Sequence, residues 1–381
     1  MKKMLVILFA LCQLFALAAC TNLASEPAAS TETLTAPVEL TVAFYGTNTT
    51  VLEKYINDFN SQNTAYRAEL RQYDPSQSGT EAAMNSLLVD LASDNAPDVL
   101  FAKRAISGTS GFLDLTPFLD SDAALSRDGF LPGLLPALEQ NGKLYQLWDG
   151  FNVLTLCAYD AADYEHLTLG EVNAAVAAQN GETALFSPFT DKYGFLSSVL
   201  PGAVSRCADE KEGTVDFDTP EMCEILSICA ALPAEPDFRD ERAYALEPLA
   251  LACADAFAYA YPEPDAQGIR FFSASDNADN YTALTCRTGG CMMLPAKGQN
   301  PQGAWEFISS VLSRDEQLAV TEVLPAHIGF PVNTSALERE LTKPADEEHA
   351  DPALTDNQRA KLTALIENAD VITASTATLY Q

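Results

Sequence analysis

The chain has 381 residues and carries 53 acidic side chains against 22 basic ones, which gives a formal net charge of −31 at pH 7. A surface this acidic repels nucleic acid and anionic lipid headgroups, so neither is expected as a partner. The length suits two domains of ordinary size, and we expect the protein to be a monomer.

The N-terminal segment 1–19 has the features of a secretory signal peptide. A lysine pair precedes the almost wholly apolar run Met4–Ala19, which is shorter than the roughly 20 residues of a membrane span. The run ends in Leu17–Cys20, which resembles a bacterial lipobox. That resemblance implies that Cys20 receives a diacylglycerol and becomes the first mature residue. The alternative is an ordinary signal peptide followed by an incidental cysteine.

The next segment, 20–37, is rich in Ser, Thr, Ala, Pro and Glu and contains too few apolar residues to bury a core. It is therefore expected to be a lipid anchor followed by a flexible linker. Together these features place the folded body on the extracellular face of a bacterial cell membrane, held there by the lipid on Cys20.

Seven cysteines follow Cys20, without a CxxC motif, and the three histidines are well separated. These patterns favour neither a metal site nor a zinc-like motif, and we expect no metal and no cofactor. Cys286 and Cys291 flank Arg-Thr-Gly-Gly and either bridge a hairpin or act, like the others, as small apolar side chains.

The first hundred residues of the body alternate between strand and helix patterns. Strands are predicted at 38–45, 66–73 and 98–102, with two helices between them. Capping boxes are expected at Thr50 with Glu53 and at Ser78 with Glu81. This βαβαβ order predicts a parallel sheet with right-handed crossovers. The helix faces expected to be buried are Val51, Leu52, Tyr55, Ile56 and Phe59 on the first helix, and Met84, Leu87, Leu88 and Leu91 on the second.

Three helices are predicted near the C-terminus. Asn300 is expected to cap the first, with Pro301 at its first position and Trp305 in its buried face. Ser335 with Glu338 is expected to cap the second. The third follows Thr355 and buries Leu362, Leu365 and Ile366.

An ordered set of segments resembles the extracellular solute-binding proteins, family 1, of bacterial ABC importers. The similarity runs from about residue 38 to about residue 370. It is strongest as a set, because no single segment is decisive. The segments are SDNAPDVLFA (93–102), GFLDLTPFLDSD (111–122), NGKLYQLWDGFNVLTLCAYD (141–160), GTVDFDTPEMCEILSICAALP (213–233), YPEPDAQG (261–268), NPQGAWEFISSVLSRDEQ (300–317) and GFPVNTSALERE (329–340).

The resemblance implies an α/β, two-lobed, periplasmic-binding-protein-like fold, in which each lobe is a mainly parallel sheet flanked by helices and the ligand cleft lies between the lobes. It assigns 38–148 plus 262–342 to lobe 1 and 149–261 plus 343–381 to lobe 2, with 261–268 as the returning crossover. Family members commonly continue through further C-terminal helices. This sequence stops at ITASTATLYQ, so either the chain is short or it is truncated, and the completeness of the second lobe stays open.

Ligands of open parallel α/β sheets bind beyond the carboxyl ends of the strands. Loops starting at Tyr45, Lys103 and Trp148 should point there. Carbohydrate recognition needs flat aromatic faces and side chains that hydrogen-bond hydroxyl groups. The aromatic candidates are Tyr45, Trp148, Phe151 and Tyr261, and the polar candidates are Thr47, Asn48, Lys103, Arg104, Asp149 and Asn152.

Trp148 is the leading candidate, because a tryptophan at a polar turn is seldom wholly buried. Each of the others has a structural alternative. Tyr45 covers a sheet edge, Phe151 belongs to the core, Asp149 orients the crossover, and Tyr261 stiffens the hinge. Lys103 and Arg104 are surface charges in the same alternative.

Two functions of different class remain. The first is a receptor, not an enzyme, that captures a small solute such as a mono- or oligosaccharide by lobe closure and delivers it to the permease subunits of an ABC transporter; sensing the solute for a partner kinase is a variant of it. The second is a secreted hydrolase acting on glycans, which needs only two well-placed carboxylates. No GxSxG, HExxH, GxxxxGK[ST] or GxGxxG motif occurs, which favours the receptor.

Overall fold

The structure is a computed structural model that describes residues 36–102, 110–160, 166–209, 214–263, 268–274, 279–286, 290–324, 328–345 and 353–372, without the side chains of 205, 208 and 209. The expected signal peptide, the anchor at Cys20, and Lys103 and Arg104 lie outside these residues. Glu39–Gln381 forms one compact unit. Within the described ranges, no helix combines the length and hydropathy that crossing a bilayer requires.

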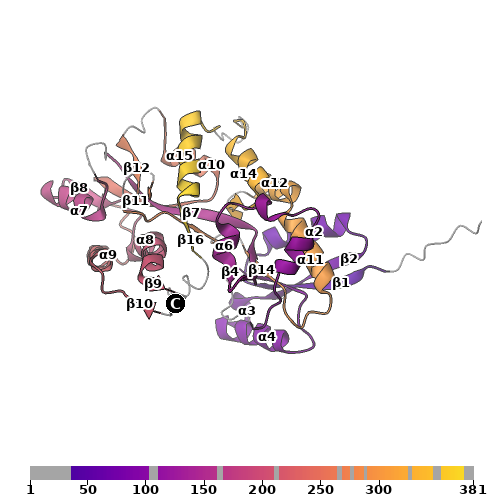
Figure 1. The fold of residues 1–381 in the computed structure, drawn as a ribbon. Helices are drawn as coiled ribbons and strands as arrows, with labels where there is room; N and C mark the ends of the chain where they lie inside the picture. The colour runs from indigo at the N-terminus through magenta and orange to yellow at the C-terminus, as the bar shows by residue number, and fades with distance from the viewer. Residues whose placement is uncertain are drawn as a thin grey trace, which may run out of the picture. The chain divides into compact units, whose positions relative to one another are not determined.

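The first sheet has the strand order β2-β1-β3-β14-β6, of which β1, β2 and β14 are labelled in Figure 1. β1 pairs with β3 in parallel, whereas β14 is antiparallel to both β3 and β6. The three predicted strands are confirmed, the third beginning one residue later than expected. The strands are β1 (Val38–Tyr45), β2 (Tyr66–Tyr73), β3 (Val99–Ala102), β6 (Leu147–Trp148) and β14 (Cys291–Met293).

The second sheet has the order β16-β13-β7-β11-β8, and β12 and β15 also pair with β7. β7 is antiparallel to β11 and β13, whereas β8 runs parallel to β11. The strands are β7 (Gly150–Ala158), β8 (Thr183–Phe186), β11 (Ala243–Leu251), β12 (Arg270–Phe271), β13 (Ala283–Thr285), β15 (Phe330–Pro331) and β16 (Asp370–Val371).

The α/β fold is confirmed, but the sheets are mixed rather than mainly parallel. The reason lies in the path of the chain. It enters the second sheet along β7 and leaves it along β13, and two neighbouring strands that cross in opposite directions must be antiparallel. The return to the first sheet therefore falls between Thr285 and Cys291, later than the expected crossover at 261–268.

Helices surround both sheets (Figure 1). Those preceding the crossover into the second sheet are α2 (Thr50–Gln62), α3 (Pro75–Ser78), α4 (Thr80–Ala92), α5 (Thr116–Ser121) and α6 (Leu134–Leu138), with a 3₁₀ turn at Arg127–Gly129. Those that follow are α7 (Leu169–Ala178), α8 (Lys192–Cys207), α9 (Pro220–Ala231), α10 (Ala254–Ala260), α11 (Pro301–Leu312), α12 (Arg314–Val323), α14 (Thr334–Leu341) and α15 (Asp356–Glu367). Two short hairpins complete the elements: β4 (Glu139–Gln140) with β5 (Lys143–Leu144), and β9 (Ala208–Asp209) with β10 (Thr214–Val215).

The first helix buries the predicted face, but its cap lies one residue earlier than expected. All five apolar residues of that face are buried. Thr49 is the N-cap, and its hydroxyl donates a hydrogen bond to Glu53 (2.7 Å) instead of accepting one from the backbone.

The second predicted helix starts differently. Asp74 caps the separate short helix α3, with Pro75 at its first position, so Ser78 ends α3 and does not cap α4. α4 begins after Gly79, and the predicted capping box with Glu81 is wrong. Of the expected face only Leu87 is fully buried, and Leu88 is 44% exposed.

The C-terminal helices follow the predictions more closely. Asn300 and Pro301 occupy the expected positions, although the backbone N–H of Asn300 is bound by Asp98 Oδ1 (2.9 Å). Trp305 is buried as expected and donates from Nε1 to Asp122 (2.8 Å). Asn333, rather than Ser335, caps α14. The three apolar residues expected in α15 are buried.

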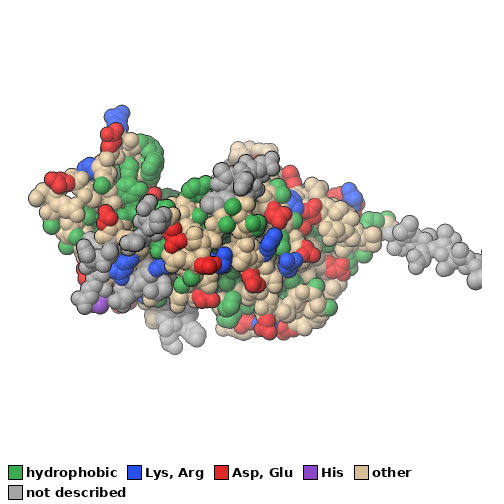
Figure 2. All heavy atoms as spheres, turned by 90° about the horizontal axis from the view of Figure 1, so that it is seen from above, with side chains coloured by type: hydrophobic (Ala, Val, Ile, Leu, Met, Phe, Trp, Pro, Cys, Tyr) green, Lys and Arg blue, Asp and Glu red, His purple; other side chains and the backbone are tan. Residues whose placement is uncertain are grey.

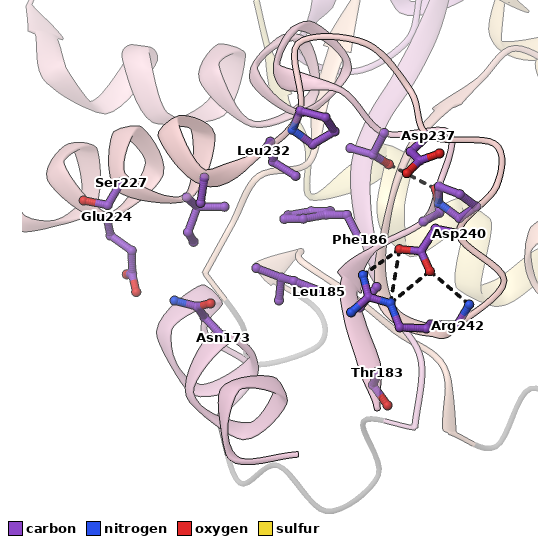
Figure 3. A pocket seen from close by; sticks show the side chains of 17 residues that line it. Asn173, Thr183, Leu185, Phe186, Glu224, Ser227, Leu232, Asp237, Asp240 and Arg242 are labelled. Atoms are coloured by element: carbon purple, nitrogen blue, oxygen red, sulfur yellow. Dashed lines mark hydrogen bonds and ion pairs between the residues drawn. The ribbon is translucent and has the colours of Figure 1, made fainter. Parts of the chain in front are cut away.

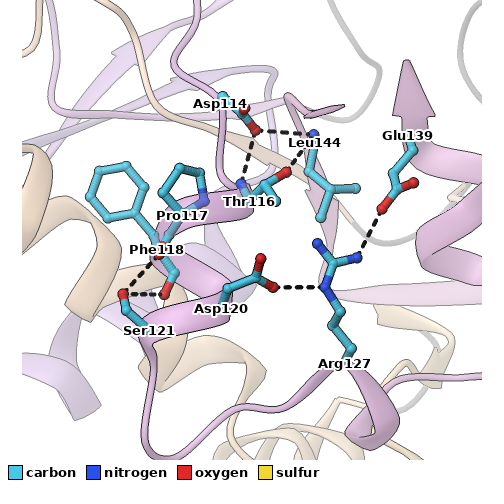
Figure 4. Close-up of polar contacts among 9 residues, drawn as sticks. All are labelled: Asp114, Thr116, Pro117, Phe118, Asp120, Ser121, Arg127, Glu139 and Leu144. Carbon is cyan, nitrogen blue, oxygen red and sulfur yellow. Dashed lines mark hydrogen bonds and ion pairs between the residues drawn. The ribbon is translucent and has the colours of Figure 1, made fainter. Parts of the chain in front are cut away.

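Polar contacts fix the segment that leads into the crossover (Figure 4). Asp114 Oδ1 accepts hydrogen bonds from the backbone N–H groups of Thr116 (3.0 Å) and Leu144 (3.3 Å). Arg127 bridges Asp120 and Glu139, at 2.7 and 2.8 Å. These contacts hold α5 against the β4–β5 hairpin, which stands immediately before β6.

Two hydrophobic clusters form the core. One surrounds the first sheet and continues along β7, and the other lies among β8, α8 and α9. None of the seven cysteines from Cys157 to Cys291 takes part in a disulfide, so the bridge considered for Cys286 and Cys291 is absent. On the face seen in Figure 2, carboxylates are scattered rather than gathered over one element.

Candidate functional site

The carboxyl ends of β1 and β3 meet at one edge of the first sheet. Tyr45 is paired with Ala102, Ala102 with Cys291, and Cys291 with Trp148. Residues paired directly across neighbouring strands point to the same face of a sheet. Two predicted site residues, Tyr45 and Trp148, therefore lie in one row at this edge, although they are far apart in the sequence.

The loop after β1 exposes polar side chains at this edge. Thr47 and Asn48 are both exposed. Gln72 Nε2 donates to the carbonyl of Gly46 (2.9 Å), and Asn48 Oδ1 accepts from the N–H of Thr50 at the start of α2 (3.1 Å). The loop is therefore held in place while its side chains stay accessible to a solute.

The crossover around Asp149 is an internal connection. The Asp149 carboxylate is buried and accepts hydrogen bonds from Gly290 N (2.6 Å) and from the Tyr55 hydroxyl (3.2 Å). Its backbone carbonyl accepts from Gln317 Nε2 (2.5 Å). Burial, reinforced by the neighbouring Asp149 carboxylate, raises the pKa of Tyr55 well above its usual value. One carboxylate thus joins α2, β14 and the crossover.

Close packing continues into β7. A Cβ added to Gly150 would lie 2.2 Å from the carbonyl oxygen of Ile328, so only glycine fits there. The Phe151 ring packs against Phe330 with 5.6 Å between centroids, and β15 pairs with β7 at this point. Phe151 belongs to the core, as its structural alternative stated.

Trp148 is buried, with 1% of its surface exposed, so the expectation that a tryptophan at this turn stays partly accessible is wrong. Pairing with β14 places it inside the sheet. Among the residues that the structure describes, its Nε1 nevertheless has no hydrogen-bond partner, and neither has Oε1 of the buried Gln146. Buried polar atoms are normally paired. These two are exceptions, and they therefore retain hydrogen-bonding capacity beside the carboxyl edge.

The remaining candidates fall in different places. Asn152 is buried on β7, where it pairs with Thr285 of β13. Tyr261 stacks on Phe257 (5.7 Å), and its carbonyl accepts from Gln358 of α15 (2.8 Å). In this conformation a solute would reach Asp149, Phe151 or Asn152 only after their neighbours moved, and the ligand roles of all the candidates stay predictions.

An exposed aromatic residue that the sequence reasoning missed is Tyr193, at the start of α8 and 67% exposed. It follows the carboxyl end of β8, where a second-lobe contact is expected. A turn places it there: Thr190 N donates to the Ser187 carbonyl (2.9 Å), and Asp191 Oδ1 accepts from Gly194 N (2.6 Å). The signal was Ser-Pro-Phe-Thr-Asp, a turn and cap sequence between a strand and a helix.

Among the residues that the structure describes, no three His, Cys, Asp or Glu side chains are grouped as metal ligands. The candidate site at the carboxyl edge of the first sheet thus consists of the exposed hydroxyl and amide groups of Thr47 and Asn48 beside a buried crossover, and Tyr193 is exposed on the second lobe.

No family model matches the sequence, and no curated protein matches it. Solved structures do match over most of their length. The sugar-binding protein MalE of Xanthomonas citri is 14% identical and superposes with a TM-score of 0.59, covering 88% of this chain and 86% of its own. The cyclic alpha-maltosyl-1,6-maltose binding protein of Arthrobacter globiformis is 15% identical, with a TM-score of 0.57 and 89% of each chain covered.

A third match is the extracellular solute-binding protein family 1 of Alicyclobacillus acidocaldarius, which is 13% identical, with a TM-score of 0.56, 89% of this chain covered and 88% of its own. Identities this low establish the fold and not the ligand. The resemblance seen in the sequence is confirmed at that level: the chain has the two-lobed fold of the extracellular solute-binding proteins, family 1.

Proposed function

We propose that this protein is a membrane-anchored extracellular receptor that captures a mono- or oligosaccharide and delivers it to an ABC transporter permease. The observation that carries the proposal is the fold itself, two sheets between which the chain crosses, which it shares with proteins named for binding sugars. The accessible Thr47 and Asn48 at the carboxyl edge of the first sheet support a polar ligand. No bond of the solute is broken in this function, so the protein is not an enzyme.

Capture works by lobe closure. A solute held by the β1 loop of the first lobe and by Tyr193 of the second contacts both only when the lobes approach. It therefore shifts the population toward the closed state by its difference in affinity for the two states. An aromatic ring offers a flat face to sugar C–H groups, while hydroxyl and amide side chains bind sugar hydroxyls.

A thermal-shift screen of the protein without residues 1–20 tests this function, with maltose, cyclic and linear glucose oligosaccharides, monosaccharides, amino acids and polyamines as the panel. A solute at 100 times its Kd adds about 2.7 kcal/mol to the free energy of unfolding. We expect a sugar to raise Tm and to be recovered unchanged. A sugar that is consumed would instead identify a glycan hydrolase, and no shift with any sugar would contradict the proposed ligand class.

Two sets of variants locate the binding and the anchor. Thr47→Ala with Asn48→Ala should remove most of the sugar-induced shift, whereas Ser86→Ala, an exposed change on α4, should leave it intact. In the full chain, Cys20→Ser should move the protein from the membrane fraction to the medium. An unchanged membrane fraction would show that Cys20 is not the anchor.

A further inference from the structure

A groove in the second lobe lies apart from the carboxyl edge of the first sheet. It has a volume of about 590 Å³ and runs between β8, helices α7 and α9, and the segment 233–242 (Figure 3). All of its walls come from this lobe. We call it the β8 groove.

One wall of the β8 groove is the open edge of the sheet. Among the described strands, β8 pairs only with β11. Ser187 N donates to the carbonyl of Leu246 on β11 (3.1 Å). Because successive backbone groups of a strand point to opposite sides, the N–H and C=O groups of Ala184 and Phe186 point to the open edge. Both residues line the groove, and Phe186 is only 5% exposed.

Unpaired backbone groups at such an edge are a template for another strand. The surroundings favour a protein segment over a small polar solute. Leu185, Ile228 and Leu232 form an apolar lining. Next in sequence to the lining residues Pro188 and Asp237, Phe189 and Phe238 pack edge to face with 5.5 Å between centroids, although they are 67% and 69% exposed. Two large exposed rings beside a groove are typical of a contact surface.

The charges in the groove are unbalanced. Arg242 is committed to Asp240, to which it donates from Nε (2.9 Å) and from a terminal nitrogen (2.6 Å), as Figure 3 shows. Glu224 and Asp237 also line the groove, and neither forms an ion pair with a described residue. Burial, together with the nearby charges of acidic residues, raises the pKa of Glu224. A cation in the groove would relieve this excess of negative charge.

We propose that the β8 groove binds an extended segment of a partner protein, which adds a strand to the open edge of β8 and places separate lysine or arginine side chains near Glu224 and near Asp237, on opposite sides of the groove (Figure 3). The backbone ladder supplies affinity, and the acidic and apolar lining selects alternate side chains of the segment. This inference does not depend on the solute that the protein binds.

Peptide probes test the proposed geometry on the full chain. The probe is an acetylated heptapeptide of alternating valine and lysine, measured by fluorescence anisotropy. Two N-methylated forms of it block either one backbone edge or the other. An added strand uses a single edge, so we expect one form to bind like the parent and the other to fail. Hydrogen exchange should slow at the amides of Ala184 and Phe186 when the peptide binds.

Variants test the lining. Glu224→Gln with Asp237→Asn should weaken the lysine peptide about tenfold and leave a valine–threonine peptide unaffected. Asp218→Asn, which removes an exposed carboxylate outside the groove, is the matched control. Ala184→Pro removes an outward N–H without touching the ladder to β11, and it should weaken both peptides.

Several results would overturn the inference. One is equal binding of the two N-methylated peptides. Another is an equal loss of peptide affinity in the lining variant and in its control Asp218→Asn. A third is a sugar-induced Tm shift that the lining variant abolishes, which would make the groove a solute site. Concentration-dependent dimerisation that Ala184→Pro abolishes would assign the groove to a second copy of this chain.

Discussion

At the scale of single residues, Asp149 is the most heavily used side chain of the crossover. The sequence suggested either a ligand contact or a structural role, and its bonds to Gly290 and Tyr55 favour the structural one. These partners lie far away along the chain, so no local pattern around Trp148–Asn152 pointed to them. Buried acceptors of this kind stabilise by satisfying donors that would otherwise be unpaired.

Asp149→Ala should lower the free energy of unfolding by about 3 kcal/mol, because two buried donors lose their acceptor. Tyr55→Phe removes only one of the two hydrogen bonds and should cost about 1 kcal/mol. Urea denaturation measures both. Equal effects would show that the bond to Gly290 contributes nothing.

Glu316 on α12 predicts a dependence of stability on pH. Burial, aided by Asp58 and opposed by Lys54, raises the pKa of Glu316 to about 7 from its usual 4.5. The folded state therefore holds this proton more tightly than the unfolded state. The stability from the protonated form is fully present below pH 4.5 and is lost as the pH rises through 7.

Glu316→Gln keeps the shape of the protonated side chain at every pH. The variant should be more stable than the natural protein at pH 8, by about 1–2 kcal/mol, and the difference should disappear near pH 4.5. Glu322→Gln, an exposed change on the same helix, is the control. A difference between Glu316→Gln and the natural protein that is the same at both pH values would contradict the raised pKa.

At the scale of elements, the sequence patterns predicted correctly those strands and helices whose formation depends on residues close in the sequence. The alternation of β1 and β2 and the apolar face of α2 were read correctly, because each depends on neighbours within a few residues. α4 was misread, since the helix α3 takes up the residues assigned to its cap. The mixed sheets were missed because strand direction depends on where a distant segment returns.

The crossover between β6 and β7 depends on one glycine. Gly150→Ala should destabilise the protein by about 3 kcal/mol, because the new methyl group meets the backbone oxygen of Ile328, which cannot move away as a side chain does. Gly129→Ala is the control, with its nearest atom at 3.6 Å. A Tm for Gly150→Ala within a degree of that control would show that the backbone at Ile328 moves aside without destabilising the protein.

At the scale of the whole molecule, the sequence predicted the two-lobed fold better than the site within it. The fold follows from the order of many segments, each of which tolerates local errors. A ligand contact instead requires knowing which side chains remain accessible. The accessibility predicted for Trp148 was wrong, because Trp148 pairs with β14 and is buried. The accessibility of Tyr193 was missed, because it depends on how α8 begins.

The fluorescence of the two tryptophans reports separately on the crossover and on helix α11. Trp148 lies at the crossover and Trp305 in α11, where it stacks on Phe118 (5.8 Å). In Trp305→Phe the remaining indole should change its emission when a bound solute closes the lobes, because the crossover lies where the lobes join. In Trp148→Phe the emission should stay constant. The same response in both variants would rule out a local change at the crossover.

The strand β7 has a consequence for how the folded body comes apart. All nine of its residues are buried, and it pairs with β11, β12, β13 and β15. It begins against the segment 328–331, and both hydrophobic clusters include its side chains. Neither lobe can therefore melt while the other keeps its core intact. The slowest-exchanging amides should lie along β7, and heating should give a single cooperative transition even though the sheets are two.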